Sequence, residues 1–166
     1  DNKPGKETVF TVYIPTGPKE VQPETEVSPI LPTGNERILF VDDEPSLAEI
    51  GKKSLERLGY GVETRTSSIE ALKLFQKSPD KFDLIITDMT MPGMTGDKLA
   101  IEVKKIRADI PVVICSGYSD EEMANRAKQV GISAFLMKPL VIQDLANTVR
   151  DVLGKTDSSG ISPVAN

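Results

Sequence analysis

The sequence contains no histidine and a single cysteine, Cys115. The absence of histidine excludes a Ser-His-Asp triad, a histidine metal ligand and a phosphohistidine within this chain. A lone cysteine cannot form an internal disulfide, which fits a reducing compartment. No apolar run approaches the roughly 18 to 20 residues of a membrane span, and no signal peptide opens the chain. We therefore expect a cytoplasmic location.

The composition also limits the class of partner. The net charge is −5 and the pI is near 4.9, which argues against binding carried mainly by nucleic-acid phosphates or anionic membranes. Apolar residues make up 39% of the chain and charged residues 27%, as in ordinary soluble domains. These numbers favour either a chemistry based on carboxylates or a binding module.

Short apolar runs alternate with segments of helical periodicity along most of the chain. Strands are expected over residues 37–41, 61–65, 82–87, 111–115 and 133–137. Helices are expected over about 45–59, 67–77, 95–107, 119–130 and 141–153, with inner faces that include Ile50, Ile69 and Ile106. This alternation predicts an α/β fold, a doubly wound five-stranded parallel sheet with five helices.

The ends of the chain differ from this pattern. Residues 9–15 are rich in β-branched and aromatic side chains and predict one strand within a segment 1–15. Residues 16–35 carry prolines and glutamates and predict a semi-extended linker. The α/β domain is expected over 36–154, with Gly154 ending the last helix, and a disordered tail over 155–166.

Four of the five expected strands end in a polar or charged side chain: Asp42-Asp43, Asp88, Ser116 and Lys138. In an open parallel sheet, ligands bind outside the carboxyl ends of the strands. Converging carboxylates repel unless a cation compensates them, and an oxygen-only ligand set suits Mg²⁺. An isolated Asp-Asp-Glu is usually only a turn or a helix cap. The signal lies in four such residues at successive strand ends.

Asp88 is the candidate for covalent chemistry. An aspartate can act as a nucleophile that accepts a phosphoryl group. The phosphoryl oxygens could then bond Mg²⁺, the Lys138 ammonium and the Ser116 hydroxyl, which supplies the charge neutralisation that phosphoryl transfer needs.

These motifs resemble those of the response-regulator receiver domain over roughly Arg37 to Leu153. The resemblance rests on the acidic pair, the acceptor with its following loop, the hydroxyl, the aromatic and the lysine: Asp42-Asp43, Asp88, Met91-Pro92, Gly96, Ser116-Gly117, Phe135 and Lys138-Pro139. It implies a flavodoxin-like sheet with strand order 2-1-3-4-5.

The resemblance also implies a role for each site residue. Asp43 and Asp88 would bind Mg²⁺ directly, together with the backbone carbonyl of Thr90, and Asp42 would act through water. The Lys138-Pro139 peptide is expected to be cis. Phosphorylation would draw Ser116 inward and let Phe135 turn, which would remodel the face of the fourth helix, fifth strand and fifth helix. Phe135 could equally be a plain core aromatic.

The N-terminal segment from Gly5 to Pro15 resembles the end of a histidine-kinase ATP-binding domain, although Glu7 replaces a glycine of that pattern. The chain is therefore interpreted as the receiver of a hybrid histidine kinase, whose remainder, with any membrane anchor, would lie upstream. The expected partner is a kinase or phosphotransfer domain that carries a phosphohistidine.

Two other functions remain open from the residues alone. One is an aspartate-nucleophile phosphohydrolase, although such enzymes usually place Asp-x-Asp on the first strand. The other is a receiver-like binding module that is never phosphorylated. For the leading interpretation we expect self-phosphorylation and slow dephosphorylation, without turnover of an external substrate or kinase activity.

Overall fold

The computed structural model describes residues 31–117 and 130–158. The expected strand at 9–15, most of the expected linker and tail, and the expected helix at 119–130, apart from its last residue, lie outside these described residues. The elements follow one another along the chain as β1 (Arg37–Val41), α1 (Pro45–Arg57), β2 (Gly61–Arg65), α2 (Ser68–Lys77), the 3₁₀ turn η1 (Pro79–Lys81), β3 (Leu84–Asp88), α3 (Gly96–Ile106), β4 (Val112–Ser116), β5 (Ala134–Met137) and α5 (Ile142–Ser158).

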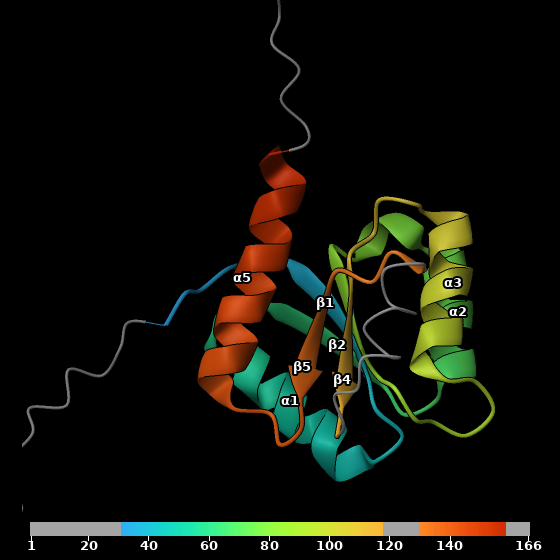
Figure 1. The fold of residues 1–166 in the computed structure, drawn as a ribbon, viewed down its shortest axis with the longest axis horizontal. Helices are drawn as coiled ribbons and strands as arrows, with labels where there is room; N and C mark the ends of the chain where they lie inside the picture. Colours follow the sequence, from blue (N-terminus) through green and yellow to red (C-terminus); the bar gives the residue numbers. More distant parts are fainter. Residues whose placement is uncertain (1–30, 118–129, 159–166) are drawn as a thin grey trace, which may run out of the picture.

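The five strands form one parallel sheet in the order β2-β1-β3-β4-β5 (Figure 1). β3 lies at its centre, and all five of its residues are buried. The predicted strand order and fold class are confirmed. The observed strand bounds differ from the expected ones by at most two residues, a shift that is common at the ends of elements.

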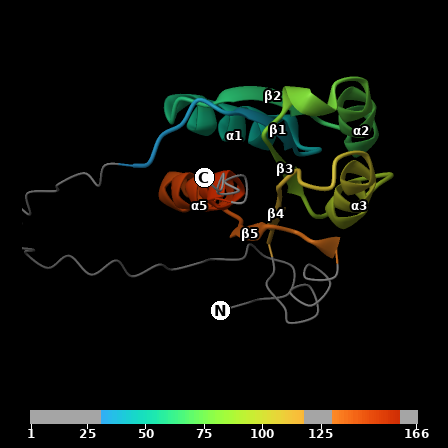
Figure 2. The same cartoon turned by 90° about the horizontal axis from the view of Figure 1, so that it is seen from above.

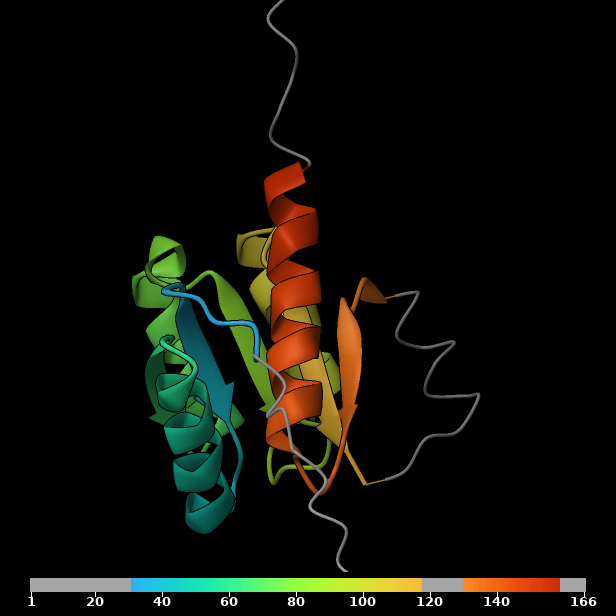
Figure 3. The same cartoon turned by 90° about the vertical axis from the view of Figure 1, so that its left-hand side faces the viewer.

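Helices cover both faces of the sheet. Figures 2 and 3 show α1 and α5 on one face, and Figure 2 shows α2 and α3 together on the other. Each face has its own core cluster. Leu55 of α1 and Val149 of α5 pack in the first cluster, and Phe75 of α2 and Val103 of α3 pack in the second. The alternating strand side chains feed both clusters, so the sheet is buried on its two sides.

Three isoleucines that were expected on inner helix faces are exposed. The exposed fractions are 54% for Ile50, 45% for Ile69 and 39% for Ile106. Each helix instead buries small residues together with larger apolar ones, and the small residues allow a close approach of the backbone. The buried residues are Ala48, Gly51 and Leu55 in α1, Ser68, Ala71 and Phe75 in α2, and Gly96, Leu99, Ala100 and Val103 in α3.

Gly154 does not end the last helix, as the sequence had suggested. α5 continues to Ser158. A glycine stops a helix when it adopts a left-handed conformation after the last turn, whereas within a helix it only costs about 1 kcal/mol relative to alanine. Gly154 is not among the described glycines with positive φ, which are Gly59, Gly93 and Gly131.

Candidate functional site

The Asp88 side chain lies at the carboxyl end of β3, where it is 7% exposed. Its two carboxylate oxygens have different partners. The backbone N–H of Thr90 donates to Oδ2 at 2.9 Å, and the Nζ of Lys138 lies 2.6 Å from Oδ1. The buried charge is therefore compensated by one hydrogen-bond donor and one cation, as its desolvation requires.

Asp42 follows β1 on the neighbouring strand and is 1% exposed. The backbone N–H of Glu44 donates to Asp42 Oδ1 at 3.0 Å, and Lys138 Nζ donates to Oδ2 at 2.9 Å. Asp43 is exposed to solvent. The acidic pair thus divides into one carboxylate that is buried against a lysine and one that faces outward.

Lys138 joins the two buried carboxylates. It follows β5, and its backbone N–H donates to the carbonyl of Ser116 at 2.9 Å, which sets the lysine beside the end of β4. Burial lowers the pKa of Lys138, but hydrogen bonds to Asp88 and Asp42 raise it by more, so the pKa lies above its usual value. The ammonium is therefore a permanent positive charge at neutral pH. The Lys138-Pro139 peptide is cis, as predicted.

The hydroxyl lies on β4, which pairs with β3, and the aromatic lies on the edge strand β5 beyond it. Ser116 ends β4 and is 6% exposed. It directly follows Cys115, which is the register partner of Asp88. The Cys115 carbonyl accepts the N–H of Met89 at 2.9 Å. Phe135 lies on β5 and is half-buried. Burial raises the pKa of the Cys115 thiol to about 12, so it is a core residue and not a reactive thiol.

Gly96 brings the start of α3 against the end of β3. A Cβ at this position would lie 2.2 Å from the backbone oxygen of Asp88, and the Gly96 N–H donates to the Met89 carbonyl at 2.9 Å. Only glycine permits this approach. Its signal in the sequence is a glycine at the first helical position, directly after Thr95.

The donor set at this edge of the sheet consists of oxygen atoms only and includes three aspartates against one lysine, which fits a hard divalent cation. Among residues 31–117 and 130–158, however, no three acidic, cysteine or histidine side chains gather as a metal-binding group. The described site therefore offers two close carboxylates, joined by a lysine, with Asp43 beside them in the chain.

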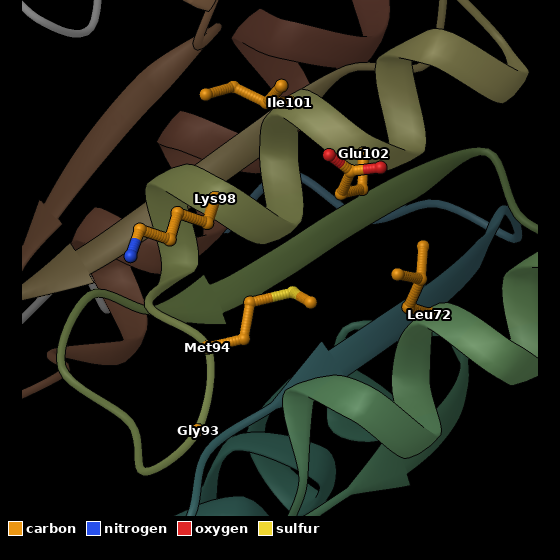
Figure 4. A pocket seen from close by; sticks show the side chains of 6 residues that line it. All are labelled: Leu72, Gly93, Met94, Lys98, Ile101 and Glu102. Atoms are coloured by element: carbon orange, nitrogen blue, oxygen red, sulfur yellow. The ribbon is translucent and has the colours of Figure 1, made fainter.

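A second hollow lies between α2 and α3. This groove of about 300 Å³ is lined by Leu72, Gly93, Met94, Lys98, Ile101 and Glu102 (Figure 4). It shares the loop after β3 with the acidic site through Gly93 and Met94, but none of the predicted site residues lines it. The groove and the strand-end cluster are therefore separate features.

A model of the response regulator receiver domain matches residues 38–150 of the chain. The sensor kinase CckA of Brucella abortus is 29% identical over 171 residues, a match that covers 95% of this chain and 18% of the kinase. The two-component response regulator ARR10 of Arabidopsis thaliana is 35% identical, with 82% of this chain and 24% of the regulator covered. The chain thus spans a quarter or less of the length of these relatives.

Solved structures show the same fold. A response regulator receiver domain protein from Clostridium thermocellum matches with a TM-score of 0.71 and 33% identity, over 75% of this chain and 98% of its own. The chemotaxis protein CheY4 of Vibrio cholerae matches with a TM-score of 0.68 and 31% identity, over 72% and 99%. Within the part of the chain that the structure describes, no helix is long and apolar enough to cross a membrane.

Proposed function

The chain belongs to the response regulator receiver domain family, and we propose that Asp88 is the residue of this receiver that accepts the phosphoryl group. The observation that carries the proposal is the pairing of Asp88 at the tip of the central strand. One of its oxygens contacts the fixed charge of Lys138, and the other accepts the N–H of Thr90. This geometry orients a carboxylate beside a positive charge at the edge of the sheet where a phosphodonor would approach.

Receiver domains work with phosphotransfer partners in two-component systems. For this chain we propose a donor that carries a phosphohistidine. A carboxylate oxygen of Asp88 forms a bond to phosphorus while the bond from phosphorus to the histidine nitrogen breaks. The electron pair of that bond stays on the imidazole, which then takes a proton from water. Lys138 supplies positive charge beside the oxygens as negative charge develops on them.

Receiver domains of this family are generally Mg²⁺-dependent. The residues proposed to hold the ion here are Asp43 and Asp88 directly, the Thr90 backbone carbonyl, and Asp42 through water. The oxygen-only donor set supports this assignment. When bound, the ion would neutralise charge on the transferred phosphoryl group. The contacts within this chain would orient Asp88 through the Thr90 N–H and hold Asp42 against Lys138.

Ser116 and Phe135 are proposed to report the phosphorylated state. Ser116 directly follows Cys115, the register partner of Asp88, so it lies on the strand next to Asp88 and one residue further along. Phe135 is half-buried on the next strand, and its ring is proposed to turn when Ser116 moves. Movement of the hydroxyl toward a phosphoryl group would change the surface that includes β5 and α5.

The wider protein is proposed to be a hybrid histidine kinase. The match to sensor kinase CckA covers 95% of this chain. It must therefore include most of residues 1–30, which precede the receiver match that begins at residue 38. The resemblance of the N-terminal segment to the end of an ATP-binding domain agrees with this. Under this proposal residues 1–15 are the remnant of that domain that contains its last strand, and residues 16–35 are the linker.

The decisive experiment is phosphorylation of the purified chain by a small phosphodonor with Mg²⁺. We expect the wild type to gain the mass of one phosphoryl group and the Asp88→Asn variant to gain none. Asp83→Asn is the matched control, because it removes a carboxylate near the opposite end of the same strand. An equal gain in Asp88→Asn, or none in the wild type, would refute the assignment. Rapid hydrolysis of the donor without build-up of the phosphorylated protein would favour the phosphohydrolase instead.

A further inference from the structure

Residues 31–36 pack on the domain before β1 begins; we call this segment the strap. Leu31 packs against the core cluster of the α1 and α5 face. The Gly34 N–H donates to the carbonyl of Leu58 at 3.1 Å, and the carbonyl of Glu36 accepts the Gly61 N–H at 3.0 Å. The last part of the expected linker is thus attached to the corner between α1 and β2.

Two glycines allow this close approach. A Cβ on Gly34 would lie 2.3 Å from Glu36 Oε2, 2.4 Å from Tyr60 Cε1 and 2.9 Å from Arg150 Nη1. Gly59 has a φ of +96°, and a Cβ there would lie 2.5 Å from the Gly34 oxygen. The backbone of the strap at Gly34 therefore lies directly against the backbone at Gly59, with no side chain between them, and this contact fixes the position of the strap.

An ion pair joins the strap to α5. Arg150 Nη2 lies 2.7 Å from Glu36 Oε1, and both side chains are partly buried. Burial raises the pKa of Glu36, but the hydrogen bond from Arg150 and bonds from backbone N–H groups lower it by more, so the pKa lies below its usual value. In Figure 3 the strap is the light-blue coil that leads into the blue arrow of β1, and α5 is the red helix beside it.

α5 also reaches the other end of the molecule. It begins at Ile142, shortly after Lys138, and runs to Arg150 and beyond, a rise of about 12 Å between Ile142 and Arg150. One helix therefore contacts the strap and follows directly from the lysine that joins Asp42 and Asp88. No other described helix is known to form an ion pair with the strap.

We propose that docking of the strap is energetically coupled to the position of α5. The surface formed by the α1–β2 corner and Arg150 is then an intramolecular interaction surface whose occupant is residues 31–36 of this same chain. Any displacement of α5 changes the docking of the strap, and by reciprocity a pull on the segment before Leu31 changes α5. The proposal goes beyond the acceptor chemistry, because it involves no residue of the Asp88 site.

The test is amide hydrogen exchange of the 166-residue chain, since exchange of a protected amide follows the population of its open state. Glu36→Gln should speed exchange at Gly34 roughly tenfold, as expected for loss of a charge-assisted bond, and should also speed exchange in α5 around Arg150. Asp83→Asn is the matched control. Asp83 also accepts a backbone N–H and pairs with an arginine, but its partner in both contacts is Arg37.

The reverse direction uses variants in the helices. Ala146→Gly weakens α5 at a buried position one turn before Arg150 and leaves the ion pair with Glu36 in place, and Ala100→Gly weakens α3 on the opposite face at a similar buried position. We expect Ala146→Gly to speed exchange at Gly34 roughly twofold or more and Ala100→Gly to leave it unchanged. If the two variants speed exchange at Gly34 equally, the effect is a loss of global stability and the proposal is overturned. It is also overturned if Glu36→Gln leaves the exchange rates in α5 around Arg150 unchanged.

Discussion

At the level of single residues, the acidic site is a problem of charge compensation. Asp42 and Asp88 are both buried, and one lysine contacts both. Two backbone N–H groups, from Glu44 and Thr90, satisfy the remaining carboxylate oxygens. With three aspartates and one lysine, the site keeps an excess of negative charge at an edge open to water. That excess favours a cation without requiring one for folding.

The proposed ligand roles predict unequal effects of two substitutions. Asp43→Ala should weaken Mg²⁺ binding by about tenfold or more, because it removes a carboxylate ligand. Ser116→Ala should change it little, because the hydroxyl is assigned to the phosphoryl group. Calorimetric titration with Mg²⁺ measures both constants. Equal losses in the two variants would contradict these assignments.

Which residues gather at the site could be predicted from the sequence, since each ends a strand of a parallel sheet. What each one contacts could not. The role of Asp42 toward Mg²⁺ through water stays a prediction, and its contact with Lys138, 96 positions away in the chain, could not be predicted. That contact depends on the path of the backbone after β5. No local pattern encodes that geometry.

At the level of elements, the packing of α1 on β1 requires a residue without a side chain at position 51. A Cβ on Gly51 would lie 2.4 to 2.8 Å from ring atoms of Phe40, which is fully buried in β1. Gly51→Ala should therefore destabilise the protein by about 1–2 kcal/mol, because overpacking outweighs the gain in helix propensity. Urea unfolding measures the change.

Gly154→Ala is the control for helix propensity alone. Nothing lies within 4 Å of a Cβ at this position of α5. This variant should gain about 0.5–1 kcal/mol, so the two glycine substitutions are expected to have opposite signs. A gain in both variants would mean that α1 can shift away from Phe40.

The same contact explains why helix faces were harder to predict than helices. The periodicity of α1, α2 and α3 located the elements, but it favoured large apolar residues as the buried ones. In α1 the sheet accepts Gly51 and leaves Ile50 exposed. The rotation of a helix is set by the surface it packs on, and a single sequence does not contain that surface.

At the level of the whole molecule, two functional regions lie at opposite ends of one sheet. The acidic cluster follows the carboxyl ends of the strands, and the strap precedes the amino end of β1. α5 extends between them on the face it shares with α1 (Figure 2). One continuous helix therefore leads from the end of the sheet that carries Asp88 and Lys138 to the strap.

This arrangement predicts where the domain begins. The sequence favoured residue 36 as its first residue, whereas the packing of Leu31 and Gly34 favours residue 31. We expect a chain that starts at Leu31 to be more stable than one that starts at Arg37 by about 1–3 kcal/mol, from one apolar side chain, two backbone hydrogen bonds and an ion pair. Urea unfolding of the two chains, made with the same N-terminal extension, measures the difference.

The pH dependence of that difference identifies the ion pair within it. Because the pKa of Glu36 is lowered from 4.5 in the folded protein, its contribution is fully present above pH 4.5 and is lost as the pH falls through the folded pKa. The stability gap between the two chains should therefore narrow in acid. In a chain that starts at Leu31 and carries Glu36→Gln, the gap should not depend on pH in this range. A gap that does not narrow in acid would assign the strap's stability to packing, and one that narrows equally with and without the carboxylate would assign the pH dependence to another titratable group. In either case the coupling to α5 would lack its electrostatic link.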